Sequence, residues 1–343
     1  MPTKLHIALI ADPAIPVPPL YYGGIERVID LLIRGLKKNG HTVSLFAHRD
    51  SLTVADNFFA YPGTNQSKSS LIKNTFLVSK LLLNKPDIVH SFGRLVYLSA
   101  LMPFGIPKMM SYQREPTIAQ VKKALKIAPK NSIYFTGCSN YITDQITPFA
   151  PAGTVYNAVS VTDYQFKNTV SDDAPLIFLG RVERIKGAHL AVNVAQQAKK
   201  KLVIAGNIPP EACAYFDAEI APFIDQKNVC YVGQVDDRQK NELLGNAAAL
   251  LMPIEWDEPF GIVMAEALAC GTPVIALNRG AAKEVVLNGT NGWLCRTIPE
   301  MVNAVANIHL INRKDCRNDA EIRFSEAALV KNFEELYFRL IKR

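Results

Sequence analysis

Residues 5–48 are LHIALIADPAIPVPPLYYGGIERVIDLLIRGLKKNGHTVSLFAH, and this stretch decides the fold class. It opens with a continuous apolar run, residues 5–11, whose length suits a buried strand. A loop rich in proline and glycine follows, and apolar residues then recur at helical spacing over residues 25–38. Gly40 ends that helix, and residues 41–48 form a second strand-like run. A strand, a loop, a helix and another strand in this order predict the start of a parallel α/β domain.

The same alternation continues along the chain and then starts again. Residues 157–174 are polar and rich in turn-forming residues, so we expect the linker between two domains there. The chain has 343 residues, about twice the usual domain size. The sequence therefore predicts two Rossmann-like, doubly wound parallel-sheet domains, residues 1–160 and 161–325, and a C-terminal helix, 326–343, that packs back toward the first domain. The further strands are expected at residues 87–91, 108–112, 133–136, 153–156, 176–179, 202–205, 229–232, 249–252 and 273–276, and the further helices at 70–83 and 187–198.

The composition is that of an ordinary globular enzyme, with 49% hydrophobic and 20% charged residues. Six cysteines lack the spacing of a zinc site, so we expect free thiols, no metal site and a cytoplasmic protein. Cys270 lies in an apolar helix end and is expected to be buried filler. No apolar run is long enough to span a bilayer.

Positive charge is concentrated in the first half of the chain. Residues 1–165 hold 17 Lys and Arg against 9 Asp and Glu, whereas the remaining residues hold 21 against 22. The first half thus carries a net charge of +8 and the second half −1. This asymmetry predicts an acidic partner for the first half, either the surface of an anionic membrane that carries a lipid-linked acceptor or a soluble phosphorylated acceptor.

The strongest chemical signal is residues 258–266, EPFGIVMAE. Its proline and glycine mark the start of a helix. The free N–H groups of Gly261, Ile262 and Val263 at that positive helix end suit a diphosphate. Glu258 can reach past the phosphates toward a sugar, and Glu266 can accept two hydrogen bonds from ribose hydroxyls. Either carboxylate alone would be taken for a helix cap or a solvated charge, but the small apolar residues around Glu266 favour the binding interpretation.

A second signal is Gly180-Arg181 followed by Lys186-Gly187, between a predicted strand and a predicted helix. Doubly wound sheets bind ligands at the carboxyl ends of their strands. Arg181 and Lys186 can neutralise a diphosphate there and stabilise the charge that grows as a sugar leaves. A basic surface loop is the alternative interpretation.

Together these motifs resemble the family 4 glycosyltransferases of the GT-B fold, and the resemblance covers nearly the whole chain. It implies retaining transfer of a hexosyl group from a UDP- or GDP-sugar to a glycan, lipid-linked or small-molecule acceptor, with no metal or other cofactor. It also implies a donor in an interdomain cleft, with the acceptor mostly on the first domain. Besides the residues above, it rests on Gly23-Gly24, the strand that ends at His90, residues 156–159, residues 271–274, and Gly280 with Glu284.

The resemblance also implies a role for individual residues. Arg181 and Lys186 correspond to the cations of the diphosphate site, Glu258 to the acceptor of the sugar hydroxyls and Glu266 to that of the ribose. The backbone of Gly23 and Gly24 would approach the donor phosphates, since neither residue has a Cβ atom. The remaining implied contacts are those of Gly206 and Val235 with the nucleobase, and support of the pocket by Glu284.

Departures from the family pattern are concentrated in the first domain. Relatives often carry a second histidine two residues after the first, where this chain has Phe92. His90 is expected either to line the active site or to be a buried structural histidine. Tyr22 and Arg114 are candidates for binding the acceptor, although Arg114 could equally pair with a surface acid.

Other functions remain open from sequence alone. A Rossmann dehydrogenase would need G-x-G-x-x-G after residues 5–11, and the sequence has none there. A sugar-nucleotide epimerase or a phosphorylase could share the architecture. A non-catalytic module that binds sugar or nucleic acid would suit the basic first half, but it would not need the donor residues, so no nucleic-acid partner is expected.

Overall fold

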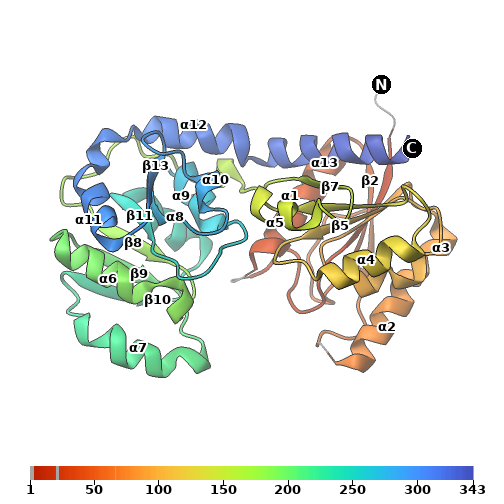
Figure 1. The fold of residues 1–343 in the computed structure, drawn as a ribbon, viewed down its shortest axis with the longest axis horizontal. Coiled ribbons are helices and arrows are strands. Elements are labelled where there is room, and N and C mark those ends of the chain that lie inside the picture. Colours follow the sequence, from red (N-terminus) through yellow and green to blue (C-terminus); the bar gives the residue numbers. More distant parts are fainter. Residues whose placement is uncertain (1–3, 21–22, 66, 343) are drawn as a thin grey trace. The chain divides into compact units, whose positions relative to one another are not determined.

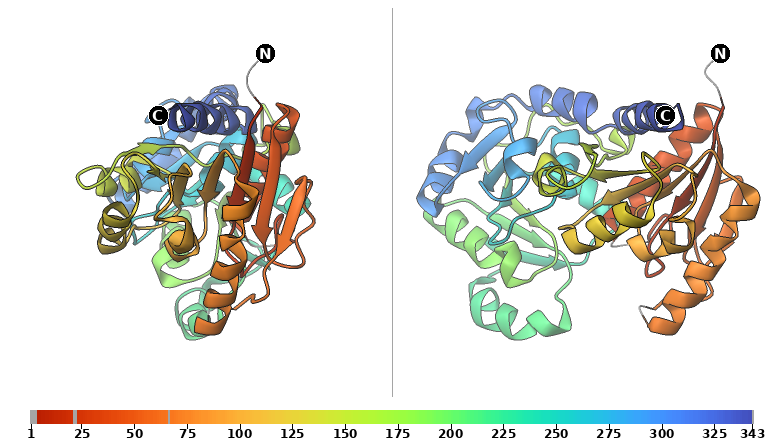
Figure 2. Two further views of the ribbon diagram at one scale, coloured as in Figure 1. Left: turned by 90° about the vertical axis from the view of Figure 1, so that its right-hand side faces the viewer. Right: turned by 45° about the vertical axis from the view of Figure 1, so that its right-hand side comes forward.

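The computed structural model describes residues 4–20, 23–65 and 67–342 of the chain, which divide into two compact units. The first unit comprises Met1–Ala158 together with Glu326–Arg343, and the second comprises Val159–Ser325. Each unit is a parallel sheet with helices on both faces (Figures 1 and 2). Among the described residues, no helix has the length and apolarity needed to cross a membrane.

The first unit is built on a seven-stranded parallel sheet with the order β3-β2-β1-β4-β5-β6-β7. The strand order reverses between β1 and β4, which places the topological switch point of this unit beside their carboxyl ends. Apart from β7 and the exposed edge strand β3, the strands are buried along most of their length, as expected for a sheet covered on both faces. The strands are β1 His6–Ile10, β2 Thr42–Ala47, β3 Asn57–Ala60, β4 Ile88–Ser91, β5 Lys108–Tyr112, β6 Ile133–Gly137 and β7 Ala152–Thr154.

Helices of the first unit cover that sheet. Helix α1, Gly24–Lys38, buries one apolar face and ends at Asn39 and Gly40. The last helix of the chain, α13, packs against α1, and a Cβ atom on Gly35 would lie 2.2 Å from Val330 Cγ2. The other helices are α2 Lys68–Ser79, α3 Leu81–Asn84, η1 Leu95–Leu101, α4 Ile118–Ile127, α5 Asn140–Ile146 and α13 Glu326–Ile341.

The second unit repeats the design with a six-stranded parallel sheet, β10-β9-β8-β11-β12-β13. Its order reverses between β8 and β11. The strands are β8 Leu176–Leu179, β9 Leu202–Ala205, β10 Val229–Gly233, β11 Ala249–Met252, β12 Val274–Leu277 and β13 Gly292–Cys295. The helices are η2 Val161–Asp163, η3 Arg184–Lys186, α6 Ala188–Gln197, η4 Pro210–Ala212, α7 Cys213–Glu219, η5 Ala221–Phe223, α8 Asp237–Asn246, α9 Ile262–Ala269, α10 Ala282–Val285, α11 Ile298–Ala306, η6 Ile308–Leu310 and α12 Arg313–Arg323.

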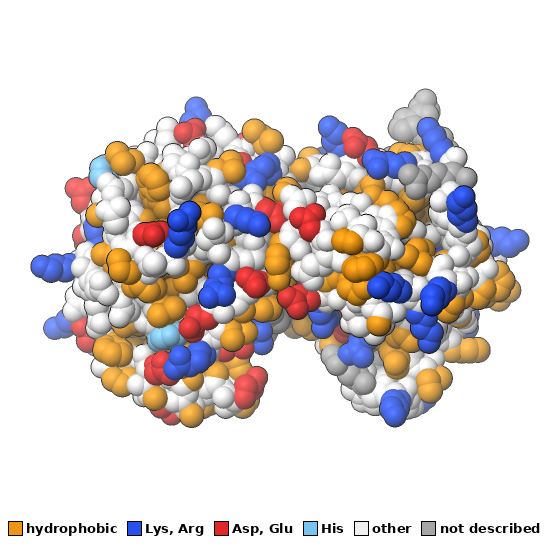
Figure 3. All heavy atoms as spheres, viewed as in Figure 1, with side chains coloured by type: hydrophobic (Ala, Val, Ile, Leu, Met, Phe, Trp, Pro, Cys, Tyr) orange, Lys and Arg blue, Asp and Glu red, His pale blue; other side chains and the backbone are white. Residues whose placement is uncertain are grey.

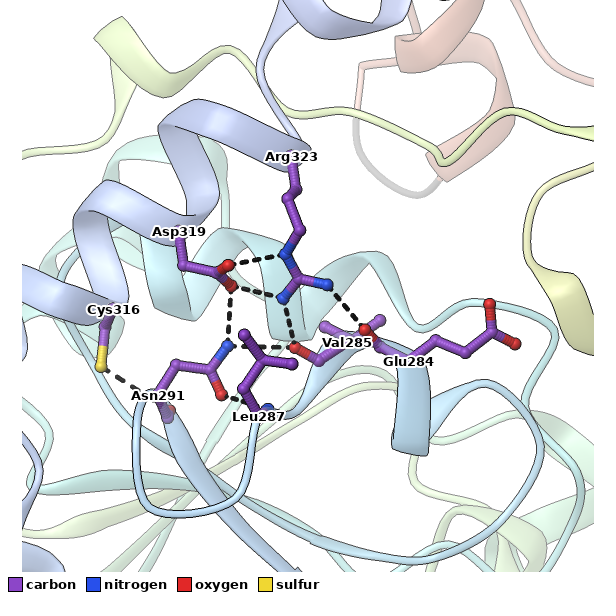
Figure 4. Close-up of polar contacts among 7 residues, drawn as sticks. All are labelled: Glu284, Val285, Leu287, Asn291, Cys316, Asp319 and Arg323. Carbon is purple, nitrogen blue, oxygen red and sulfur yellow. Dashed lines mark hydrogen bonds and ion pairs between the residues drawn. The ribbon is translucent and has the colours of Figure 1, made fainter.

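A polar network joins α12 to the segment around α10 (Figure 4). Arg323 pairs with Asp319 at 2.5 Å and donates to the backbone carbonyls of Glu284 and Val285. Asn291 bridges the same groups, because its amide nitrogen donates to both Asp319 and the Val285 carbonyl. The network therefore fixes the backbone that follows β12.

The predicted fold class is confirmed: both halves form doubly wound parallel sheets. Strands β3 and β13 were not predicted; each is a four-residue strand at the edge of its sheet.

Candidate functional site

The candidate donor site lies at the carboxyl edge of the second sheet, at its switch point. Strands β8 and β11 are parallel neighbours, with Leu176 opposite Ala249 and Ile177 opposite Leu250. The chain leaves β8 toward α6 and leaves β11 toward α9, and the two loops diverge from adjacent strand ends. This is the position at which open α/β sheets bind ligands.

Lys186 and Glu258 meet between these two loops. Lys186 Nζ lies 2.7 Å from Glu258 Oε2, and Trp256 Nε1 donates to the same oxygen at 3.0 Å. The Lys186 ammonium also lies 4.6 Å from the centroid of the Trp256 ring. Both charged side chains are mostly buried, with exposed fractions of 18% and 12%. The two residues predicted from separate motifs are thus brought together, and Trp256 is a third member that sequence reasoning missed.

Arg181 stands on the same loop as Lys186. Its guanidinium pairs with Glu183 at 2.8 Å, and a third of its side chain is exposed. Arg181 and Lys186 thus supply two cations after the end of β8, each paired with a glutamate. A cation in such a partly buried position interacts more strongly with an incoming anion than it would in water.

The backbone of Glu258 is held by the loop after β12. Ala281 N–H donates to the Glu258 carbonyl at 2.8 Å, and Gly280 N–H donates to Asp257 at 3.1 Å. A Cβ atom on Gly280 would lie 2.4 Å from the Glu258 carbonyl oxygen, so a larger residue would displace this loop. The Glu284 side chain extends away from the Arg323 network (Figure 4). The hydrogen bond described for the Glu258 carbonyl thus comes from the backbone of Ala281, and support of the pocket by Glu284 stays a prediction.

Helix α9 begins beside this carboxylate. Gly261 is its N-cap, with φ of 79°, a left-handed conformation in which glycine is favoured. Met264 N–H donates the first hydrogen bond of the helix, to the Gly261 carbonyl. The N–H groups of Gly261, Ile262 and Val263 come before it in the chain and therefore have no carbonyl of the helix to bind. The predicted helix start is therefore observed, and it lies beside Glu258, the partner of Lys186; that it binds an anion stays a prediction.

Glu266 lies on the second turn of α9 and is buried, with 6% exposed. Its Oε1 accepts from Lys240 Nζ at 2.5 Å and from Tyr164 Oη at 2.7 Å. Sequence reasoning found the carboxylate but neither of these partners. Burial, with the Glu266 charge adding to it, raises the pKa of Tyr164 well above its ordinary value, so the phenol remains a neutral donor.

The two residues expected near the nucleobase lie on neighbouring loops of this sheet. Gly206 follows β9, and Val235 lies between β10 and α8. A Cβ atom on Gly206 would lie 1.8 Å from the Gly180 carbonyl oxygen, so packing by itself already requires glycine at this position. Val235 is partly exposed.

In the first unit, Gly23 and Gly24 form the entry to α1. Gly23 is the N-cap, and a Cβ atom on it would lie 2.7 Å from Pro19 Cβ, which gives this glycine a local packing reason. Glu26 follows on the first turn and is buried, and burial raises its pKa to about 7. Tyr22, a predicted acceptor contact, lies outside the described residues.

His90 is entirely buried at the end of β4. Its Nδ1 is 2.6 Å from Tyr337 Oη, and its Nε2 is 2.6 Å from Ser111 Oγ. The ring packs against Phe92 and Phe333, and burial lowers the pKa of His90 to about 3, so the imidazole is neutral. These surroundings are those of a structural histidine, which was one of the two interpretations of its sequence position.

Arg114 follows β5 and is exposed, lining a cavity of the first unit. The six cysteines are free, and burial raises the pKa of Cys270 to about 12, so it is an inert thiol. Within residues 4–20, 23–65 and 67–342, no cluster of three His, Cys, Asp or Glu could hold a metal ion.

Two family patterns match this chain, one in each unit. The family described as glycosyl transferases group 1 matches residues 161–321, which include the whole candidate donor site. The family described as glycosyltransferase family 4 matches residues 22–119 of the first unit.

Individual relatives agree with these matches. An uncharacterised 41.2 kDa protein of the cps region of Klebsiella pneumoniae is 26% identical over 92% of this chain and 96% of its own. Among solved structures, sucrose-phosphate synthase from Thermosynechococcus elongatus has a TM-score of 0.80 at 19% identity, covering 99% of this chain and all of its own. Anabaena HepE in complex with UDP-glucose has a TM-score of 0.75 at 15% identity, covering 98% and 100%. At these identities the structural matches establish the two-domain GT-B fold alone.

Proposed function

Because the chain belongs to glycosyltransferase family 4, a retaining family that uses nucleotide-sugar donors, we propose that its second unit binds the donor and its first unit the acceptor. We propose further that it moves a hexosyl group from a UDP- or GDP-sugar to a glycan, lipid-linked or small-molecule acceptor. The observation that carries the proposal is the Lys186–Glu258–Trp256 cluster at the switch point, beside the N-terminus of α9.

The diphosphate of the donor fits the positive side of this cluster. Lys186 pairs with Glu258 just before α9, and Arg181 stands on the same loop as Lys186, so we assign these two cations and the N–H groups at the start of α9 to the diphosphate. When the bond between the anomeric carbon and the phosphate oxygen breaks, negative charge grows on that oxygen, and fixed cations nearby lower the barrier. No divalent metal is then needed to balance the leaving group, and the proposed reaction proceeds without one.

The two glutamates then take different tasks. Both hydrogen bonds described for Glu258 end on Oε2, so Oε1 is the oxygen we assign to a sugar hydroxyl. Glu266 already accepts from Lys240 and Tyr164, and an ionised carboxylate has further lone pairs for the ribose hydroxyls. The complex of Anabaena HepE makes UDP-glucose the first donor to test.

The proposal is tested by replacing Lys186 with alanine. We expect the transfer rate to fall about 100-fold or more, as when one group that stabilises the developing charge is lost, and UDP to bind more weakly by calorimetry. Lys201→Ala is the matched control. Lys201 immediately precedes β9, so it lies at the amino ends of the strands, whereas the candidate site lies at their carboxyl ends. Equal activity of Lys186→Ala and Lys201→Ala would contradict the assignment.

We also propose that the first unit contacts an anionic membrane surface on the cytoplasmic side. Its excess of positive charge supports this, as do exposed lysines and apolar side chains that lie together over α4 (Figure 3). Each lysine near an acidic leaflet adds about 1 kcal/mol. The protein should sediment together with anionic vesicles at low ionic strength, and added salt should release it from them. A protein that ignores such vesicles would leave only a soluble acidic acceptor.

A further inference from the structure

A cavity of about 570 Å³ lies in the first unit at the carboxyl ends of β4 and β5. Its walls come from the loops that follow these strands, from helix α4 and from Leu71 of α2. All of its lining residues fall between 71 and 127, so the first unit builds it alone. The volume lies within the range of about 300–1,000 Å³ that is typical of small-molecule sites.

One part of the lining is apolar. Leu95, Met102 and Met110 are buried beneath the cavity, and Val96 and Ile127 stand at its edge, 38% and 47% exposed. Methionine is flexible and polarisable, so such a floor adapts to a flexible apolar group. A sugar ring on this floor would bury hydroxyl groups without partners, at a cost of about 1–3 kcal/mol each. The floor therefore favours an apolar ligand group.

The other part of the lining is cationic. Arg94, Arg114 and Lys123 line the cavity, against one acid, Glu115, which accepts from Tyr141 Oη at 2.9 Å. Three cations and one acid give a net charge of +2. Arg114 and Lys123 are exposed, so a ligand can reach them from solvent. Arginine and lysine in this number beside a cavity suit an organic phosphate.

Tyr112 supplies a third, independent feature. Its side chain lines the cavity and the residue is only 7% exposed, yet its hydroxyl has no hydrogen-bond partner among the described residues. The Oε1 atom of the next residue, Gln113, is also buried and has no hydrogen-bond partner among the described residues. An unpartnered buried polar atom costs about 1–3 kcal/mol, which a ligand that hydrogen-bonds to it would recover. Burial raises the pKa of Tyr112 to about 12, so the hydroxyl is a donor at neutral pH.

We propose that this cavity is the acceptor site and that the acceptor is an amphiphile, an apolar chain that carries a phosphate group. The chain lies on the Met102 and Met110 floor, and the phosphate lies between Arg114 and Lys123 within reach of Tyr112. The identification as acceptor rests on the proposed function, whereas binding of the amphiphile can be measured without it.

Calorimetry on the full chain tests the site, with saturating UDP present so that phosphate groups do not enter the donor site. The probes are geranyl phosphate, inorganic phosphate and geraniol. Geranyl phosphate should bind at least tenfold more tightly than either fragment, because only it occupies both parts of the lining. The double variant Arg114→Glu/Lys123→Glu should lose at least tenfold in affinity. Lys126→Glu is the control, since Lys126 is exposed on α4 but does not line the cavity.

Two results would overturn the proposal: geranyl phosphate binding no more tightly than inorganic phosphate, or an equal loss in the double variant and in Lys126→Glu. Retention of the protein on vesicles that contain undecaprenyl phosphate, lost in the double variant, would support the site and identify a membrane-borne acceptor. Binding of geranyl phosphate without such retention would support it and identify a soluble one. A separate failure of UDP to bind would count against the proposed function and not against this cavity.

Discussion

Replacing Glu26 with glutamine is expected to make the stability of the first unit less dependent on pH. Glu26 lies on the first turn of α1 and is 5% exposed. Burial is the largest cause that raises its pKa, from about 4.5 to about 7; Asp12 raises it further, whereas its own backbone N–H and Arg114 lower it. The folded protein therefore binds this proton more tightly than the unfolded chain does.

The sign of the effect follows from that difference. Because the folded pKa is raised, the contribution to stability is complete below pH 4.5 and is lost as the pH rises through 7. At about 1.36 kcal/mol per pKa unit, the wild type loses about 3 kcal/mol through this group. Glutamine does not titrate. The free energy of unfolding of Glu26→Gln, relative to that of the wild type, should therefore rise by about 3 kcal/mol between pH 4.5 and pH 8.

Urea unfolding at several pH values measures this gain. Both tryptophans, Trp256 and Trp293, lie in the second unit, so fluorescence follows that unit alone while circular dichroism at 222 nm follows both. Subtracting each wild-type value cancels the other titrating groups. Glu335→Gln, which replaces an exposed carboxylate on α13 of the same unit, is the control variant for removing a carboxylate at the surface. An equal free-energy difference between Glu26→Gln and wild type at pH 5 and at pH 8 would refute this prediction.

The donor site and the last helix give three further predictions. Transfer should survive EDTA, since Lys186 and Arg181 supply the positive charge; activity that disappears with chelator and returns with manganese would contradict this. Glu258→Gln should slow transfer but keep or strengthen UDP binding, because Lys186 loses the carboxylate that pairs with it. Glu266→Ala should instead weaken UDP binding about tenfold. Equal affinities of the two variants for UDP in calorimetry would refute these separate roles of the two glutamates. Deleting residues 326–343 uncovers the apolar face of α1 and should cause aggregation or loss of cooperative unfolding, and a truncated chain that melts like the full one would show the opposite.

The buried strands could be predicted well from sequence. Strands β5, β8, β9 and β11 have the predicted bounds, and β8, β9 and β11 are the continuous apolar runs expected of parallel strands covered on both faces. Helices α8 and α12 carry few apolar residues, and sequence reasoning missed both. Their positions are set by capping and tertiary contacts: Asp236 forms a capping box at α8, and the Arg313 guanidinium at the start of α12 donates to three backbone carbonyls.

Sequence reasoning found the charged residues of the donor site but none of their partners. Lys186 and Glu258 are 72 residues apart, and no spacing rule predicts that their side chains form an ion pair. Trp256 stands two residues before Glu258, and this closeness in sequence was the one indication that it could belong to the site. Lys240 and Tyr164 approach Glu266 from elements distant in sequence, and only the packing of the sheet reveals them. The environment of His90 likewise depends on Tyr337 of α13, which lies 247 residues further along the chain.

That last contact has a consequence for biosynthesis. The second unit is one uninterrupted segment, Val159–Ser325, whereas the first unit needs α13 to cover α1 and to give His90 its partner Tyr337. Ribosomes add about 5–20 residues per second, so Tyr337 emerges about 12–50 s after His90. The first unit therefore cannot complete its core before the second unit has been synthesised, although N-terminal domains usually fold first. The first unit retains an uncovered apolar face for chaperones to protect until α13 has been synthesised.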